Sequence, residues 1–195
     1  MSLFNIDELQ KIARRTLRLD ERYFAADSAQ IDHILQTYSK FDYSKEYDIF
    51  LSHSYKDRLA VAGLAEHLKM QYGYEVYVDW IEDGSLDRSN VSRVTAQVIR
   101  NKMQRCRSLF YVTSANSSSS KWMPWELGLM DGMKEKVAIC PLVKELYSSD
   151  RYHGQEYLGL YPYITETKAS STVLWVNNDQ QHYITFEQWI NGGSI

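Results

Sequence analysis

Short apolar runs and helical stripes alternate along most of the chain. From Tyr47 onward, the apolar runs predict five strands, at residues 47–52, 75–78, 108–112, 137–143 and 172–176. Between the first strands, apolar residues recur at every third or fourth position. This spacing predicts helices marked by Val61, Leu64, Ala65 and Leu68 and by Val91, Val94, Thr95 and Val98. Strands that alternate with helices predict βαβ units and an α/β fold with a parallel sheet.

The two ends of the chain follow other patterns. A helical stripe near the N-terminus consists of Ile6, Leu9, Ala13 and Leu17. We interpret residues 1–44 as an N-terminal helical extension and residues 45–195 as one domain with its core at 45–143. The tyrosine-rich segment 144–171 has no clear period and is expected to pack as a covering loop. Thr185 and Gln188 form a capping-box pattern, which predicts a last short helix.

A serine-rich loop and the helix after it, Ser114–Lys134, place a carboxylate among apolar side chains. The apolar stripe of this helix consists of Trp122, Trp125, Leu129, Met130 and Met133. Glu126 falls inside the stripe, although an unpaired buried carboxylate costs several kcal/mol. One interpretation is a structural glutamate that the helix dipole stabilises, and Pro124 supports a helix start here. The other is a carboxylate that faces a cationic ligand, and the pattern alone leaves both open.

Two polar loops are expected to lie beside Glu126. Parallel sheets bind ligands outside the carboxyl ends of their strands, where the strand order reverses. With a flavodoxin-like strand order, this crevice lies between the first and third strands. The segments Ser52–Asp57 and Ser114–Trp122 follow those two strands and would border it. Glu126 is therefore predicted to stand where a ligand is expected.

Composition excludes several classes of function. The net charge of −3 argues against general electrostatic binding to nucleic acid. No apolar run approaches the ~18 residues that a membrane span needs, so no membrane partner is expected. Cys106 and Cys140 are isolated from each other and are predicted to be reduced thiols in the core. The N-terminal residues lack a signal-peptide pattern, so the expected compartment is the cytoplasm.

Several kinds of catalytic site find little support in the sequence. His53, Ser54 and Asp57 carry the side chains of a hydrolytic triad, but close neighbours in sequence rarely converge in that way. There is no G-x-S-x-G motif and no glycine-rich phosphate loop. The scattered histidines and the two isolated cysteines do not predict a metal site.

Three motifs, taken in order, resemble those of Toll/interleukin-1 receptor (TIR) domains. They read YDIFLSHSYKD, VDWIEDGSLDRS and SSSKWMPWELG, and a looser likeness continues through GQEYLGLYPYI. The chain looks most like the bacterial branch, which includes the TIR component of Thoeris-type anti-phage systems. The resemblance implies a flavodoxin-like three-layer fold with a five-stranded parallel sheet.

The resemblance also implies an activity and a set of site residues. Enzymatic TIR domains cleave the nicotinamide–ribose bond of NAD⁺ with a glutamate that lies four residues after a tryptophan. This pattern matches Glu126 as the catalytic residue and Trp122 as a residue that stacks on nicotinamide. The other candidates for substrate binding are Ser52, His53, Ser54, Asp79 and Arg88. For Asp79 a role in structuring its loop is the alternative, and for Arg88 a salt bridge within that loop.

The expected function is therefore that of an NAD⁺ hydrolase or cyclase, with NAD⁺ as substrate, no cofactor and no metal. Family resemblance adds self-association through TIR surfaces and a separate effector protein reached through the nucleotide product. Two other functions remain open at this point. One is a non-catalytic TIR scaffold that signals by assembly, and the other is an N-glycosidase that acts on free nucleosides.

Overall fold

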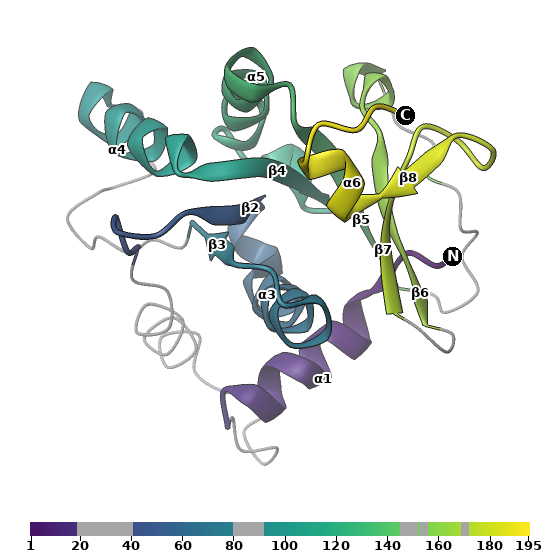
Figure 1. Ribbon diagram of the computed structural model, residues 1–195. Helices are drawn as coiled ribbons and strands as arrows, with labels where there is room; N and C mark the ends of the chain where they lie inside the picture. The colour runs from purple at the N-terminus through teal and green to yellow at the C-terminus, as the bar shows by residue number, and fades with distance from the viewer. Residues whose placement is uncertain (19–40, 80–91, 145–151, 153–155, 169–171) are drawn as a thin grey trace.

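A computed structural model describes residues 1–18, 41–79, 92–144, 152, 156–168 and 172–195 (Figure 1). Strands of the described residues join in one sheet with the order β3-β2-β4-β5-β6-β7-β8, and β1 pairs with β5. These strands are β1 (Phe4–Asn5), β2 (Tyr47–Ser52), β3 (Val76–Val78), β4 (Cys106–Thr113), β5 (Val137–Val143), β6 (Tyr163–Lys168), β7 (Thr172–Asn177) and β8 (Tyr183–Thr185). Neighbours from β3 to β6 are parallel, whereas β7 and β8 are antiparallel additions.

Apart from β1, the parallel strands are the five from β3 to β6 along this path, and they have the flavodoxin-like order, because β2 lies between β3 and β4. The predicted α/β class and its parallel sheet are confirmed. The fifth parallel strand, however, is β6 and not the predicted strand at 172–176, which forms the antiparallel β7. The sequence pattern missed β6 because its residues YITETK are mostly polar. Thr165 and Glu166 are nevertheless buried there.

Helices cover both faces of the sheet (Figure 1). The described helices are α1 (Ile6–Thr16), α3 (Arg58–Tyr72), α4 (Arg93–Gln104), α5 (Met123–Lys134) and α6 (Phe186–Ile190), with the 3₁₀ turns η1 (Tyr55–Asp57), η2 (Ser117–Ser119) and η3 (Glu156–Leu160). One face packs against α1, α3 and α6, and the other against α4 and α5. Along the middle of β4, successive side chains alternate between these two cores, with Leu109 and Tyr111 in one and Phe110 and Val112 in the other. None of the described helices is both long and apolar enough to cross a membrane.

The N-terminal segment shares the core of the sheet that follows it. Strand β1 pairs in parallel with the end of β5, and Leu9 and Ala13 of α1 are buried in the same cluster as α3. The two helices approach so closely that a Cβ on Gly63 would lie 1.8 Å from the carbonyl oxygen of Leu9. Glycine is therefore needed at position 63 for α1 to pack on α3. Residues 19–40 of the predicted extension lie outside the described residues.

On two helices the buried face differs from the predicted one. In α4, Val94 is 66% exposed, and the buried residues are Thr95, Ile99, Lys102 and Met103. Lys102 tolerates burial because its ammonium donates a hydrogen bond to the hydroxyl of Tyr77, at 2.8 Å. In α5, Met123, Glu126, Leu127 and Met130 are buried, so the buried stripe lies beside the predicted one and still includes Glu126.

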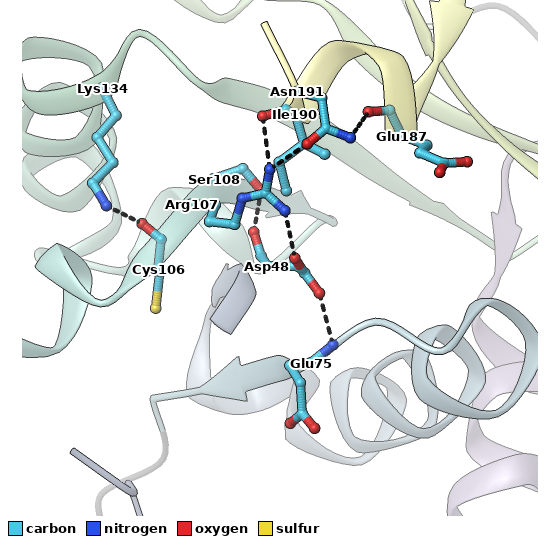
Figure 2. Close-up of polar contacts among 9 residues, drawn as sticks. All are labelled: Asp48, Glu75, Cys106, Arg107, Ser108, Lys134, Glu187, Ile190 and Asn191. Atoms are coloured by element: carbon cyan, nitrogen blue, oxygen red, sulfur yellow. Dashed lines mark hydrogen bonds and ion pairs between the residues drawn. The ribbon is translucent and has the colours of Figure 1, made fainter. Parts of the chain in front are cut away.

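Arg107 connects the C-terminal helix to the opposite, amino-terminal edge of the parallel strands (Figure 2). Its guanidinium donates to the Asp48 carboxylate at 3.1 Å and to the Asn191 side chain at 2.7 Å. It also donates to the carbonyl of Ile190 at the end of α6, at 3.2 Å. The predicted capping box of this helix is confirmed, with Thr185 and Gln188 bonded reciprocally. The end of the last helix is thus fixed near the amino-terminal ends of β2 and β4.

Candidate active site

The carboxyl ends of β2 and β4 lie side by side at the point where the strand order reverses. Ser52 ends β2 and is in register with Tyr111 of β4. Both side chains point to the face covered by α5, because Phe50 and Leu109, two residues earlier on each strand, lie in the core on that face. The serine-rich loop after β4 leads into α5, so the first turn of this helix lies at the same place. This is the position at which open α/β sheets bind ligands.

Glu126 is buried at this edge and accepts a hydrogen bond from the end of β2. Its side chain is 2% exposed, and the hydroxyl of Ser52 donates to Oε2 of Glu126 at 2.6 Å. The main-chain N–H of Glu126 donates to the carbonyl of Trp122 at 2.8 Å, so the helix is formed from its first turn. The structure therefore brings together two of the candidate residues, 74 positions apart in sequence.

Trp122 begins the same turn and is also buried. It occupies the N-cap position of α5, and its ring meets the ring of Trp125 edge to face, with centroids 5.4 Å apart. Edge-to-face contacts fix the orientation of both rings and contribute about 0.5–1.5 kcal/mol beyond their buried area. Glu126 therefore shares the first turn of α5 with two indole rings that pack against each other.

The other candidates on the β2 loop, His53 and Ser54, make contacts with the main chain. The Nδ1 atom of His53 lies 3.3 Å from the carbonyl of Leu51, and this histidine is partly exposed. Ser54 is buried at the start of η1, where its carbonyl accepts from the N–H of Asp57 at 2.9 Å. These contacts shape the turn after β2.

Asp57 joins the two loops that border the site, a connection that the sequence analysis did not predict. Ser114 donates to Oδ2 of Asp57 at 2.5 Å, and the Asn116 amide donates to Oδ1 at 2.7 Å. Ser114 also accepts from the N–H of Asn116, at 2.9 Å. The loop after β2 is thereby fixed to the loop after β4. In the sequence, the only sign of this connection is that polar residues follow both strands. Which of them pair depends on the strand register, so the contact could not be predicted.

Asp79 directly follows β3 and is buried, and its carboxylate has polar partners of its own. The hydroxyl of Tyr77 donates to Oδ1 of Asp79 at 3.0 Å, and the Lys102 ammonium lies 3.7 Å from the same oxygen. Val78 pairs with Leu51, so Asp79 and Ser52 follow the last paired residues of the two strands. Arg88 and the rest of the loop after Asp79 lie outside the described residues.

Tyrosines form a further part of the site that the sequence analysis missed. Tyr111 is buried and in register with Ser52, and Tyr157 of η3 lies near its side chain. Burial, then the nearby Tyr157 and Tyr152 and the Glu126 carboxylate, raise the pKa of Tyr111 above its usual range. Tyr111 therefore stays a neutral phenol near Glu126. In the sequence it is one aromatic residue inside an apolar strand, which gives no sign of such a role.

Neither a cluster of metal ligands nor an exposed thiol is found among the described residues. No three His, Cys, Asp or Glu side chains gather there in a way that could hold a metal ion. Cys106 and Cys140 are free and fully buried, as predicted, and burial raises the pKa of both thiols. A buried carboxylate with a hydroxyl donor and neighbouring indoles is suited to stabilise positive charge that develops on a bound substrate.

Comparison with known proteins identifies the family of this arrangement. The family model described as TIR domain matches residues 49–181. The chain is 44% identical over 193 residues to a Bacillus cereus (strain MSX-D12) protein named "Probable 3' cyclic ADP-D-ribose synthase ThsB'", covering 97% of this chain and 98% of that protein. It is also 32% identical over 84 residues to a Cytobacillus dafuensis protein named "Putative cyclic ADP-D-ribose synthase TIR2", covering 43% of this chain and 22% of that protein.

Proposed function

The chain belongs to the TIR domain family, and from this premise we propose that it is an NAD⁺ cyclase. It would cleave the nicotinamide–ribose bond of NAD⁺ and release a cyclic ADP-ribose as a signalling nucleotide. The support is the similarity to the Bacillus cereus protein, which extends along nearly the whole of both chains. The name of that relative specifies the 3' isomer, and we propose the same isomer as the main product here.

Glu126 is proposed as the catalytic residue. The pyridinium of NAD⁺ leaves as neutral nicotinamide and takes the electron pair of the C–N bond, so its departure needs no general acid. Positive charge then develops on the ribose, and a preorganised carboxylate stabilises it more strongly in a buried site than in water. Ser52 would hold the carboxylate in place through its 2.6 Å hydrogen bond. A single electrostatic contact of this kind is typically worth about 3–4 kcal/mol.

Trp122 is proposed to stack on the nicotinamide ring before the bond breaks. An indole face attracts a cation by about 0.5–2 kcal/mol, and this attraction disappears once nicotinamide is neutral. His53, Ser54, Asp79 and Arg88 are proposed to line the remainder of the substrate site. In this scheme NAD⁺ is the substrate, and no resident cofactor or metal takes part.

The cellular setting is proposed from the same family relation. We place the protein in the cytoplasm, in a Thoeris-type anti-phage defence, with self-association through TIR surfaces as its means of activation. The nucleotide product would then reach a separate effector protein.

A single observation carries the proposal, the burial of Glu126 at the carboxyl edge with its hydrogen bond from Ser52. Nicotinamide release from NAD⁺ by the purified protein, with and without a crowding agent that promotes assembly, tests it directly. Wild-type protein is expected to release nicotinamide and Glu126→Gln to lose this activity while keeping its circular dichroism spectrum. A scaffold without catalysis predicts no release under either condition, and an N-glycosidase predicts cleavage of free nucleosides instead of NAD⁺.

A further inference from the structure

The serine loop, residues 114–120, connects β4 to α5 through a series of hydrogen bonds. The main-chain N–H and the hydroxyl of Ser117 both donate to the carbonyl of Ser114, at 3.3 and 2.9 Å. The N–H of Ser120 donates to the carbonyl of Ser117 at 3.1 Å. The hydroxyl of Ser120 in turn accepts from the N–H of Met123, the first residue of α5, at 3.3 Å. These contacts connect Ser114 to the start of the helix in steps of three residues.

Asp57 fixes the beginning of the serine loop to the segment that follows β2. Its two carboxylate oxygens accept from the Ser114 hydroxyl, at 2.5 Å, and from the Asn116 amide, at 2.7 Å. Asp57 is 8% exposed, so it accepts both bonds largely out of water, where hydrogen bonds to a charged group are strong. The end of β2 and the start of α5 are therefore joined twice. One connection is the bond from Ser52 to Glu126, and the other runs from Asp57 along the serine loop.

We propose that Asp57 is a positioning residue for catalysis. Through the serine loop it holds the first turn of α5 against the end of β2, and this sets the place of the Glu126 carboxylate. The inference rests on the proposed NAD⁺ cyclase function. Asp57 contacts neither NAD⁺ nor the reacting atoms in this scheme and acts only through Glu126.

Catalysis by a carboxylate depends strongly on such positioning. A displacement of about 1 Å, caused by a change away from the reacting atoms, can lower a rate about 10²-fold. The bond from Ser52 holds the Glu126 side chain at one point, whereas the serine loop holds the main chain at the start of the helix. Serine suits the loop, because its hydroxyl forms local bonds with nearby main-chain groups.

A pair of substitutions at the Asp57 contact tests the inference. Asn116→Asp replaces the amide donor by a carboxylate, so two acceptors of like charge meet where the 2.7 Å hydrogen bond stood. Nicotinamide release by this variant should show a kcat about three- to thirtyfold below that of the wild type. Adding Asp57→Asn restores one amide and one carboxylate with their roles exchanged, and the new amide oxygen still accepts from Ser114. The double variant should therefore recover most of the wild-type kcat.

Two further measurements show whether the effect passes through the position of Glu126. Hydrogen exchange in peptides that span residues 114–126 should be faster in Asn116→Asp, because the bonds of the serine loop open more often, and should return to the wild-type rate in the double variant. In Ser52→Ala the carboxylate has already lost a donor. Adding Asn116→Asp to that variant should lower kcat by a smaller factor than it does in the wild type.

Asn191→Asp is the matched control, since it adds the same charge by the same substitution at the end of α6. The Asn191 amide donates to the carbonyl of Glu187 at 2.9 Å, near the amino-terminal ends of β2 and β4 (Figure 2). This variant should leave both kcat and the hydrogen exchange of residues 114–126 at wild-type values.

The outcomes separate this inference from the proposed function. If the wild type releases nicotinamide, but Asn116→Asp keeps its kcat or the double variant fails to recover it, the role of Asp57 is refuted and the NAD⁺ cyclase remains. If Asn191→Asp lowers kcat as much as Asn116→Asp does, the effect is one of added charge and the inference also fails. If the wild type releases no nicotinamide under any condition, the proposed function is refuted, and with it the role of Asp57 in catalysis.

Discussion

Among the residues that the structure describes, two glutamates are almost completely buried, one on each face of the same sheet. Glu126 of α5 is 2% exposed, and Glu166 of β6 is 1% exposed. Ser52 at the end of β2 donates to Glu126 at 2.6 Å. Glu166 lies 2.6 Å from the Nε2 atom of His67 and accepts from the hydroxyl of Tyr72 at 3.1 Å. Burial alone therefore does not distinguish a catalytic carboxylate from a structural one.

The surroundings of the two carboxylates show the difference. Two partners of Glu166 are side chains of α3, so this carboxylate connects a core helix to a strand. The same strand residue also exchanges main-chain hydrogen bonds with Ser2, at 2.8 and 2.9 Å. Glu126 instead lies where the loops after β2 and β4 meet, beside Trp122. A carboxylate bound to the packed interior supports stability, whereas one at the edge of the loops is placed to meet a ligand.

Exchange of each glutamate for glutamine gives the largest expected contrast. Glu126→Gln should lower the rate of nicotinamide release about 10²–10³-fold, because the developing cation loses its counter-charge. Glu166→Gln should leave this rate close to that of the wild type, but lower the free energy of unfolding by about 1–3 kcal/mol, because buried donors lose a charged acceptor. Release assays and urea unfolding of both variants measure the two effects. A loss of activity in Glu166→Gln at full folding would contradict the comparison.

Two buried serines, one at the site and one away from it, should show the same contrast between activity and stability, with smaller effects. Ser52→Ala removes a donor from a carboxylate and should lower kcat about tenfold to a hundredfold, since bonds to charged groups are worth about 1.5–3 kcal/mol. Ser108 is equally buried and donates to the carbonyl of Asp48 at 2.7 Å, near the amino end of β4 (Figure 2). Ser108→Ala should cost about 1 kcal/mol of stability and no activity. Equal kinetic losses in both variants would mean that Ser52 acts only on packing.

Much of this arrangement follows from the sequence, and the remainder depends on strand register. Strand β2 occupies the predicted residues 47–52 because its apolar run ends sharply at a polar turn. The burial of Glu126 was predicted from its place in an apolar stripe. Strand β6 was not predicted, since its polar residues are satisfied by partners far away in sequence, as Glu166 is by His67 and Tyr72. A one-dimensional pattern does not contain those partners.

The contacts within the site show the same limit. Ser52 was a candidate on the basis of family resemblance, but its bond to Glu126 requires β2, β4 and α5 to be placed together. Tyr111 gave no signal because an aromatic residue in a buried strand is ordinary. The bonds from Ser114 and Asn116 to Asp57 likewise arise only when the two strand ends become neighbours.

Two buried tryptophans on opposite faces extend the comparison to binding. Trp122→Leu should lower kcat/KM about two- to thirtyfold, because a cation–π contact of about 0.5–2 kcal/mol with nicotinamide is lost. Trp189 of α6 is also buried, and its ring already contacts a cation of the protein. The Lys136 ammonium lies 5.0 Å from the ring centroid. Trp189→Leu removes the same ring volume, so it should reduce stability without changing kcat/KM per folded molecule. Steady-state kinetics corrected for the folded fraction distinguish the two, and a silent Trp122→Leu would remove this residue from the site.

The smallest effect is expected at Tyr72, whose hydroxyl donates to the Glu166 carboxylate at 3.1 Å. Burial, and then the nearby Glu166 carboxylate, raise the pKa of Tyr72 above its usual range, so its hydroxyl remains a donor at any pH at which the fold is assayed. Tyr72→Phe should therefore lower the free energy of unfolding by about 0.5–1.5 kcal/mol, and the melting temperature by a few degrees. His67 still holds Glu166 in this variant, so kcat should not change. A measurable drop in kcat would mean that strain at Glu166 crosses the sheet to Glu126, and the two carboxylates would then be parts of one coupled site.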